Sequence, residues 1–127
     1  MRPHVGLSIV ALLSSMAGLA SAGTISSAPV VSFWGDTQDA CYVRNIGAKP
    51  VSVNVQIIRE DGAVVTPDFD SCNDGPLAPG TTCVVLADRT ATGFSACSAT
   101  TPGSAKNLRG TMEARFDFQI VSAQDLR

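Results

Sequence analysis

The sequence predicts an all-β fold, an antiparallel β-sandwich of about seven or eight short strands with two disulfides. Apolar residues recur with a period of two through most of the chain after residue 30, as in strands that bury one face. Turn-forming residues separate these stretches at intervals of about eight to twelve residues. Four cysteines complete the pattern, because an even number in an exported chain indicates a disulfide framework.

The first 22 residues have the layout of a secretory signal peptide. Arg2 and His4 give a short cationic start, residues 5–20 are mostly apolar, and Ala20-Ser21-Ala22 forms an A-x-A cleavage site. The apolar stretch is shorter than the roughly 20 residues that a membrane span needs. We therefore expect cleavage after Ala22, a secreted or periplasmic location, and no membrane insertion after cleavage.

Cleavage leaves 105 residues, which is the size of one domain. We expect a flexible N-terminal arm over residues 23–29, which are small and polar, and a single β-sandwich domain over residues 30–127. Eight basic and eleven acidic residues then remain, a net charge of −3 without a run of either sign. Nucleic acid is not expected as a partner, because its binding needs clustered lysine and arginine.

The clearest alternation of the first half lies in residues 51–57, where valine and isoleucine at odd positions alternate with polar residues. Residues 41–44 alternate as well, and residues 45–50 supply the turn between the two strands. Glu60-Asp61-Gly62 then predicts a hairpin turn onto residues 63–65.

The second half begins with a loop, because proline, glycine and aspartate are frequent in residues 66–80. Two further strands are predicted over residues 82–87 and 94–99, with a turn over residues 88–93 between them. The last strand signal, over residues 108–120, is the cleanest alternation in the protein.

That last segment is too long for one straight strand of a small domain. Thirteen extended residues span about 43 Å at about 3.3 Å each, whereas a domain of this size has a radius of gyration near ~13 Å. We expect residues 108–120 to bend, to fold into a hairpin or to carry a bulge, and Gly110 is the best placed residue for a bulge.

Several turn motifs resemble those of the immunoglobulin-like modules of bacterial exported proteins. They are Asn45-x-Gly47 before a V-x-V-x-V strand, then Asp61-Gly62, then Leu77-Ala78-Pro79-Gly80 before a later strand. The resemblance covers about half of the mature chain and speaks for fold rather than function. It implies an immunoglobulin-like sandwich with a role in binding, adhesion or structure.

The resemblance also implies a pairing of the cysteines. Cys41 and Cys97 would form the intersheet bridge of immunoglobulin domains, with Trp34 packed near it, and Cys72 and Cys83 would clip the proline-rich loop. The residues alone leave three pairings open. A zinc site is not expected, because the chain has no C-x-x-C pair and no histidine beyond the leader.

The only histidine, His4, leaves with the signal peptide. Ser-His-Asp and Cys-His catalysis, blue-copper centres and copper–zinc dismutase sites are thereby excluded. Residues 70–75 superficially resemble the start of a calcium loop. However, the third position is Cys72, an unsuitable ligand for a hard cation, and the twelfth is Thr81, where a bidentate glutamate belongs. Ordinary turn chemistry is therefore favoured. We expect no cofactor, no metal and no enzymatic activity.

Three residues are candidates for contact with a partner, which would be a protein or a glycan. Tyr42 and Arg44 point away from the face of Cys41, so they are exposed if the bridge is internal, and both types are common interface anchors. Phe33 and Trp34 are adjacent, so only one of them faces the core. We expect Trp34 inside and Phe33 outside.

The sequence therefore predicts a non-enzymatic secreted or periplasmic domain that acts by surface binding or in a structural role. The alternative is a secreted inhibitor of a hydrolase that presents the disulfide-clipped loop 68–80, rigid and convex, to the cleft of its target. A further face has alternating charge and is expected to be a solvated strand face with cross-strand ion pairs; it comprises Arg109, Glu113, Arg115 and Asp117.

Overall fold

The computed structural model describes residues 22–33, 37–89, 92–117 and 119–127. These residues form nine strands and one short 3₁₀ turn, and every strand pairing is antiparallel. The signal peptide expected over residues 1–22 lies outside the described residues except for Ala22, and so does Trp34. The strands are β1 (Gly23–Ser26), β2 (Val30–Ser32), β3 (Thr37–Asn45), β4 (Asn54–Arg59), β5 (Phe69–Asp70), β6 (Thr82–Arg89), β7 (Gly93–Thr101), β8 (Leu108–Phe116) and β9 (Gln119–Leu126).

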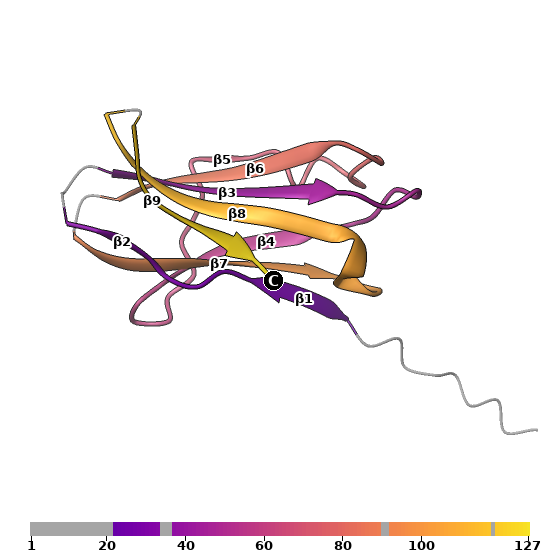
Figure 1. Cartoon of the computed structure of the whole chain (residues 1–127), viewed down its shortest axis with the longest axis horizontal. Helices are drawn as coiled ribbons and strands as arrows, with labels where there is room; N and C mark the ends of the chain where they lie inside the picture. The colour runs from indigo at the N-terminus through magenta and orange to yellow at the C-terminus, as the bar shows by residue number, and fades with distance from the viewer. Residues whose placement is uncertain (1–21, 34–36, 90–91, 118) are drawn as a thin grey trace, which may run out of the picture.

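The strands are arranged in two sheets, which lie as two layers in Figure 1. One sheet has five strands in the order β5-β6-β3-β8-β9. In the other, β7 is central, with β4 along one side and β1 and β2 in line along the other. This sandwich-like arrangement confirms the predicted all-β, antiparallel fold, with more strands than the seven or eight expected.

The core fills the space between the sheets because each main strand turns alternate residues inward. The inward positions of β3 include Cys41 and Val43, those of β4 include Val55 and Ile57, and all four are buried. Met112 contributes from β8 and is also fully buried. Each large apolar side chain buried in this way stabilises the fold by about 1.5–3 kcal/mol.

Both implied disulfides are present. Cys41 of β3 is bonded to Cys97 of β7, so this bridge joins the two sheets. Cys72 is bonded to Cys83 and ties the loop before β6 to that strand. No cysteine in the described residues is free.

The expected flexible arm over residues 23–29 is wrong, because Gly23–Ser26 forms β1 and pairs with the end of β7. Ile25 is buried, so one apolar side chain is enough to anchor the strand. Gly23 fits because a Cβ there would lie 2.4 Å from the backbone nitrogen of Ala105. Ser26 and Arg127 also exchange backbone hydrogen bonds of 3.0 and 3.1 Å, which join β1 to the end of β9.

The strand expected over residues 51–57 is shorter than predicted, because β4 begins at Asn54. Val51 instead forms an isolated bridge with Leu77 in the following loop. The hairpin that follows is confirmed as a turn. Arg59 donates its amide to the carbonyl of Ala63, and only an isolated bridge forms beyond it.

The remaining strand predictions hold with longer bounds than expected. β6 and β7 cover the segments predicted over residues 82–87 and 94–99, each extended by two residues or more. The loop over residues 66–80 contains one two-residue strand, β5, which pairs with β6.

Residues 108–120 form a hairpin, which is one of the three expected solutions. β8 ends at Phe116 and β9 begins at Gln119. The bulge lies between Ala114 and Arg115, so the expectation of a bulge at Gly110 is wrong. Gly110 is required for another reason, since a Cβ there would lie 2.5 Å from the carbonyl oxygen of Tyr42.

Candidate functional site

The outer face of the five-stranded sheet carries two of the three predicted contact residues. Tyr42 of β3 is half-buried and lies opposite Thr111 of β8, whereas Arg44 is exposed and lies opposite Arg109. Their neighbours Cys41 and Val43 are fully buried, so the prediction that Tyr42 and Arg44 face outward is confirmed.

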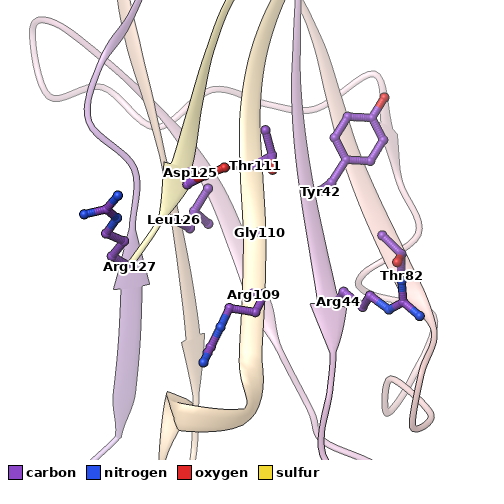
Figure 2. Close-up of a pocket in the computed structure, with 9 residues that line it drawn as sticks. All are labelled: Tyr42, Arg44, Thr82, Arg109, Gly110, Thr111, Asp125, Leu126 and Arg127. Carbon is purple, nitrogen blue, oxygen red and sulfur yellow. Dashed lines mark hydrogen bonds between the residues drawn. The ribbon is translucent and has the colours of Figure 1, made fainter.

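A groove of about 710 Å³ runs across this face over β6, β3, β8 and β9. Figure 2 shows that its side chains come from strands far apart in the sequence. Register brings them together, because residues directly opposite on neighbouring strands share a face. The side chains that line it include Tyr42, Arg44, Thr82, Arg109, Asp125 and Arg127.

The groove is cationic. Arg44 and Arg109 are direct cross-strand neighbours, an arrangement that destabilises a sheet by like-charge repulsion. Figure 2 shows the two side chains pointing away from each other. Nη1 of Arg109 donates to the carbonyl oxygens of Lys106 and Leu108 at 2.9 and 2.6 Å. Within the described ranges, Arg44 has neither an ion pair nor a side-chain hydrogen bond.

One carboxylate balances part of this charge. Asp125 of β9 lies opposite Thr111, whose hydroxyl donates to Oδ1 of Asp125 at 3.5 Å. The groove therefore holds the guanidinium groups of Arg44, Arg109 and Arg127 against a single acidic side chain. A ligand with an anionic group is favoured there.

The ring of Tyr42 is held from one side. The guanidinium of Arg115 lies 5.4 Å from the ring centroid, a cation–π contact worth about 0.5–1 kcal/mol at an exposed site. Nε and Nη2 of Arg115 both donate to Oε2 of Glu113, at 2.9 and 2.6 Å. Glu113 thus orients Arg115, and Arg115 restrains the ring.

The face of alternating charge is arranged differently from the prediction. The ion pair of Glu113 and Arg115 runs along β8, whereas we expected cross-strand pairs. Asp117 lies in the turn after β8 with a φ of 48° and is not part of the strand. Arg109 lines the groove and takes no part in the ion pair of Glu113 and Arg115.

Phe33 does not join the other two candidate residues. It follows β2 in the four-stranded sheet and is 75% exposed, as predicted. Phe94, which is also exposed, lies opposite Val31 on the same sheet. The predicted contacts therefore fall on two different sheets.

The loop over residues 68–80 lies along the edge of the five-stranded sheet. The amides of Asp68 and Ser71 donate to carbonyl oxygens of β6 at 2.9 and 3.0 Å, and Leu77 is buried. Oδ1 of Asp70 accepts the amide of Cys72 at 2.8 Å, which is the expected turn chemistry. The loop covers an edge strand that would otherwise expose unpaired backbone groups.

A buried polar cluster escaped the sequence analysis. Arg89 of β6 forms an ion pair with Asp39 of β3, and Nη1 of Arg89 donates to the carbonyl of Gly93 at 2.6 Å. The hydroxyl of Ser95 on β7 donates to Oδ2 of Asp39 at 2.7 Å. All three side chains are 2% exposed or less. Because Asp39 and Arg89 belong to the five-stranded sheet and Ser95 to the other sheet, the cluster joins the two sheets. The sequence did contain a signal for the burial of Asp39, because this residue lies two positions before Cys41 and therefore faces the same side of the strand.

The buried cluster has the chemistry of a structural link. Asp39 accepts a serine hydroxyl, but Ser95 is inside the core, where a substrate cannot reach it. The described residues contain no group of three histidine, cysteine, aspartate or glutamate side chains that could hold a metal ion. The groove on the five-stranded sheet is therefore the stronger candidate site.

The chain was compared with known protein families, curated proteins and solved structures, and none of them matched. No helix in the described ranges is long and apolar enough to span a bilayer.

Proposed function

We propose that this chain is an exported, non-enzymatic domain with an immunoglobulin-like sandwich, and that it binds a partner through the outer face of its five-stranded sheet. The two disulfides suggest an oxidising compartment outside the cytoplasm. The n-h-c layout of the first 22 residues supports export by a signal peptide. The intersheet bridge between Cys41 and Cys97 supports the immunoglobulin-like assignment.

The observation that carries the proposal is the groove. It places Tyr42 and Arg44, residue types that dominate binding energy at interfaces, beside Arg109 on one face. Arg44 keeps its donors free and Arg115 restrains the ring of Tyr42, so part of the surface is organised before a partner arrives. Such preorganisation lowers the entropy cost of binding.

Catalysis has little support by comparison. The chain after residue 22 contains no histidine, and histidine is the commonest general base near neutral pH. Binding of a protein or a glycan does not require a histidine.

The alternative role as a hydrolase inhibitor depends on a loop that enters a cleft. The backbone of loop 68–80 is instead hydrogen-bonded along β6, and Leu77 is held by a bridge to Val51. These contacts favour an edge cover over a projecting tip. The sheet face therefore has the stronger support.

Affinity capture tests the proposed function. The oxidised mature domain is immobilised and exposed to a native extracytoplasmic extract, in parallel with the double variant Tyr42→Ala/Arg44→Ala. We expect the wild type to retain a component that the double variant loses, because the variant removes both anchors.

The control is Phe33→Ser, which changes an exposed residue of the other sheet. It should retain the same component as the wild type. Capture that is equal for all three proteins, or that depends on Phe33 instead of Tyr42 and Arg44, would count against the proposed face.

A further inference from the structure

We propose that the groove on the five-stranded sheet binds an acidic saccharide, a chain of sugar rings that carry carboxylates as well as hydroxyl groups. The inference rests on the proposed function, because it takes this face as the binding surface and names the class of its ligand. Four features carry it: the charge of the arginines in the groove, the acceptor groups beside them, the ring of Tyr42, and the pairing of the nearby sheet edges.

The arginines favour a carboxylate. Arg44 and Arg109 are opposite each other in register, and Arg44 has no counter-ion in the part of the chain that the structure describes. Arg109 uses only Nη1 for backbone carbonyls. Because the two side chains point apart (Figure 2), each guanidinium group can take a carboxylate of its own in charge-assisted hydrogen bonds, for which the fork of arginine is well shaped.

The acceptors require that the same ligand also donates hydrogen bonds. Asp125 lines the groove, and an ionised carboxylate has acceptors only. Thr82 and Thr111 add hydroxyl groups on either side of β3. A purely anionic ligand is repelled by Asp125, whereas sugar hydroxyls can donate to it.

Tyr42 supplies a flat apolar surface for a ring. Arg115 lies opposite Gln38 in register, and Arg109 lies opposite Arg44, with Tyr42 between the two pairs. The guanidinium of Arg115 lies over the ring of Tyr42, 5.4 Å from its centroid. Tyr42 is also one of the residues that line the groove.

Edge pairing disfavours an acidic peptide. A peptide that adds as a strand needs free backbone groups at a sheet edge. At the level of the groove, Ser71 already pairs with Val84 of β6 through bonds of 3.0 and 2.9 Å, and Ser26 pairs with Arg127. The ligand is left to side-chain recognition, which suits a saccharide.

Isothermal titration of the oxidised mature domain tests the proposal with oligogalacturonate as the acidic saccharide. Neutral dextran and poly-L-glutamate are titrated under the same conditions, at physiological salt. We expect binding of oligogalacturonate alone. Arg44→Ala should weaken it roughly tenfold or more, because hydrogen bonds to charged groups are lost.

Arg59→Ala is the matched control, because Arg59 lies on β4 of the other sheet and its loss changes the net charge equally. It should leave the affinity unchanged. Thermal unfolding of each variant checks that the domain stays folded. Equal weakening by Arg44→Ala and Arg59→Ala shows a general charge effect and overturns the proposal.

Asp125→Asn separates a saccharide from a simple anion. If sugar hydroxyls donate to Asp125, the variant weakens binding several-fold; if the ligand is only an anion, removal of the negative charge strengthens it, which overturns the proposal. Binding of poly-L-glutamate that depends on Arg44, or no binding of oligogalacturonate, also overturns it. Neither result decides the capture experiment, so the proposed function is still judged by that experiment alone.

Discussion

The two faces of β3 carry charge in opposite ways. On the inner face, Asp39 is fully buried and both of its oxygens are engaged, one by Arg89 and one by Ser95. On the outer face, Arg44 lies exposed opposite a second arginine, Arg109. A buried charge without a partner is strongly destabilising, whereas solvent screens an exposed one.

This difference teaches where the strand keeps its stability and where it is free to act. The inner face is constrained by a disulfide, an ion pair and apolar contacts that reach both sheets. On the outer face, exposed charges such as Arg44 are screened by solvent and are expected to contribute little to stability. If the outer face binds a ligand as proposed, stability and binding are separated by a single alternation of side chains.

The largest effect is expected from a charge on the inner face. Val43→Asp places an unpaired carboxylate at a position that is 0% exposed. The cost is about 5 kcal/mol or more, comparable with the total stability of a small domain. Circular dichroism should show an unfolded chain. The control Arg44→Asp, one residue further along, should keep the wild-type spectrum, and loss of structure in both would contradict the assigned faces.

A second substitution on the inner face removes one partner of the buried ion pair. Asp39→Ala leaves Arg89 charged and unpaired inside the core, at a cost of about 3–5 kcal/mol in urea unfolding. The double variant Asp39→Leu/Arg89→Met removes both charges and should lose less. If the double variant were less stable than the single variant, the loss of stability would come from losing the ion pair itself and not from leaving the Arg89 charge unpaired.

The two disulfides should differ in how much each contributes to the free energy of unfolding. Cys41 and Cys97 are separated by 56 residues, and Cys72 and Cys83 by 11. By loop entropy, replacing the first pair with alanine costs about 4 kcal/mol and replacing the second about 3 kcal/mol. Chemical denaturation of the two double variants measures both. A larger loss from the short bridge would mean that it does more than close its loop.

The smallest effect is expected on the outer face. Arg44→Glu replaces the repulsion of Arg109 with attraction and should raise stability by about 0.5 kcal/mol at low salt, with less gain at high salt. Thermal unfolding at two salt concentrations measures it. A loss above about 1 kcal/mol would show that Arg44 supports the fold, and the contrast between the faces would fail.

Much of the fold was predictable from local pattern. β6, β7 and β8 each bury alternate residues over most of their length, and the predicted apolar positions are among them, such as Val85 of β6, Ala99 of β7 and Met112 of β8. β1 was missed because only Ile25 anchors it, and β9 because Leu126 is its one buried residue. β1 depends on a distant partner, β7, which single-sequence periodicity does not reveal, whereas β9 pairs with its neighbour β8 but buries too few residues to show a period.

The candidate site was predictable only in part. Alternation with Cys41 was enough to place Tyr42 and Arg44 on the outer face. The groove itself depends on register, which sets Arg109 opposite Arg44 and brings Asp125 to the same face. Register is a property of strand pairing over more than 60 residues, so the sequence alone could not show that these charges meet.

The position of β1 has a consequence for the proposed export of the chain. β1 docks on residues 98–101 of β7, and the amide of Gly23 donates to the carbonyl of Gly103 at 2.7 Å. In an export that begins at the N-terminus, the partners of β1 would therefore emerge long after β1 itself. If the chain is exported and the leader is cut after Ala22, the scissile bond would stay unpaired until most of the chain has crossed, and closure of the sheet would then pair the new end with β7.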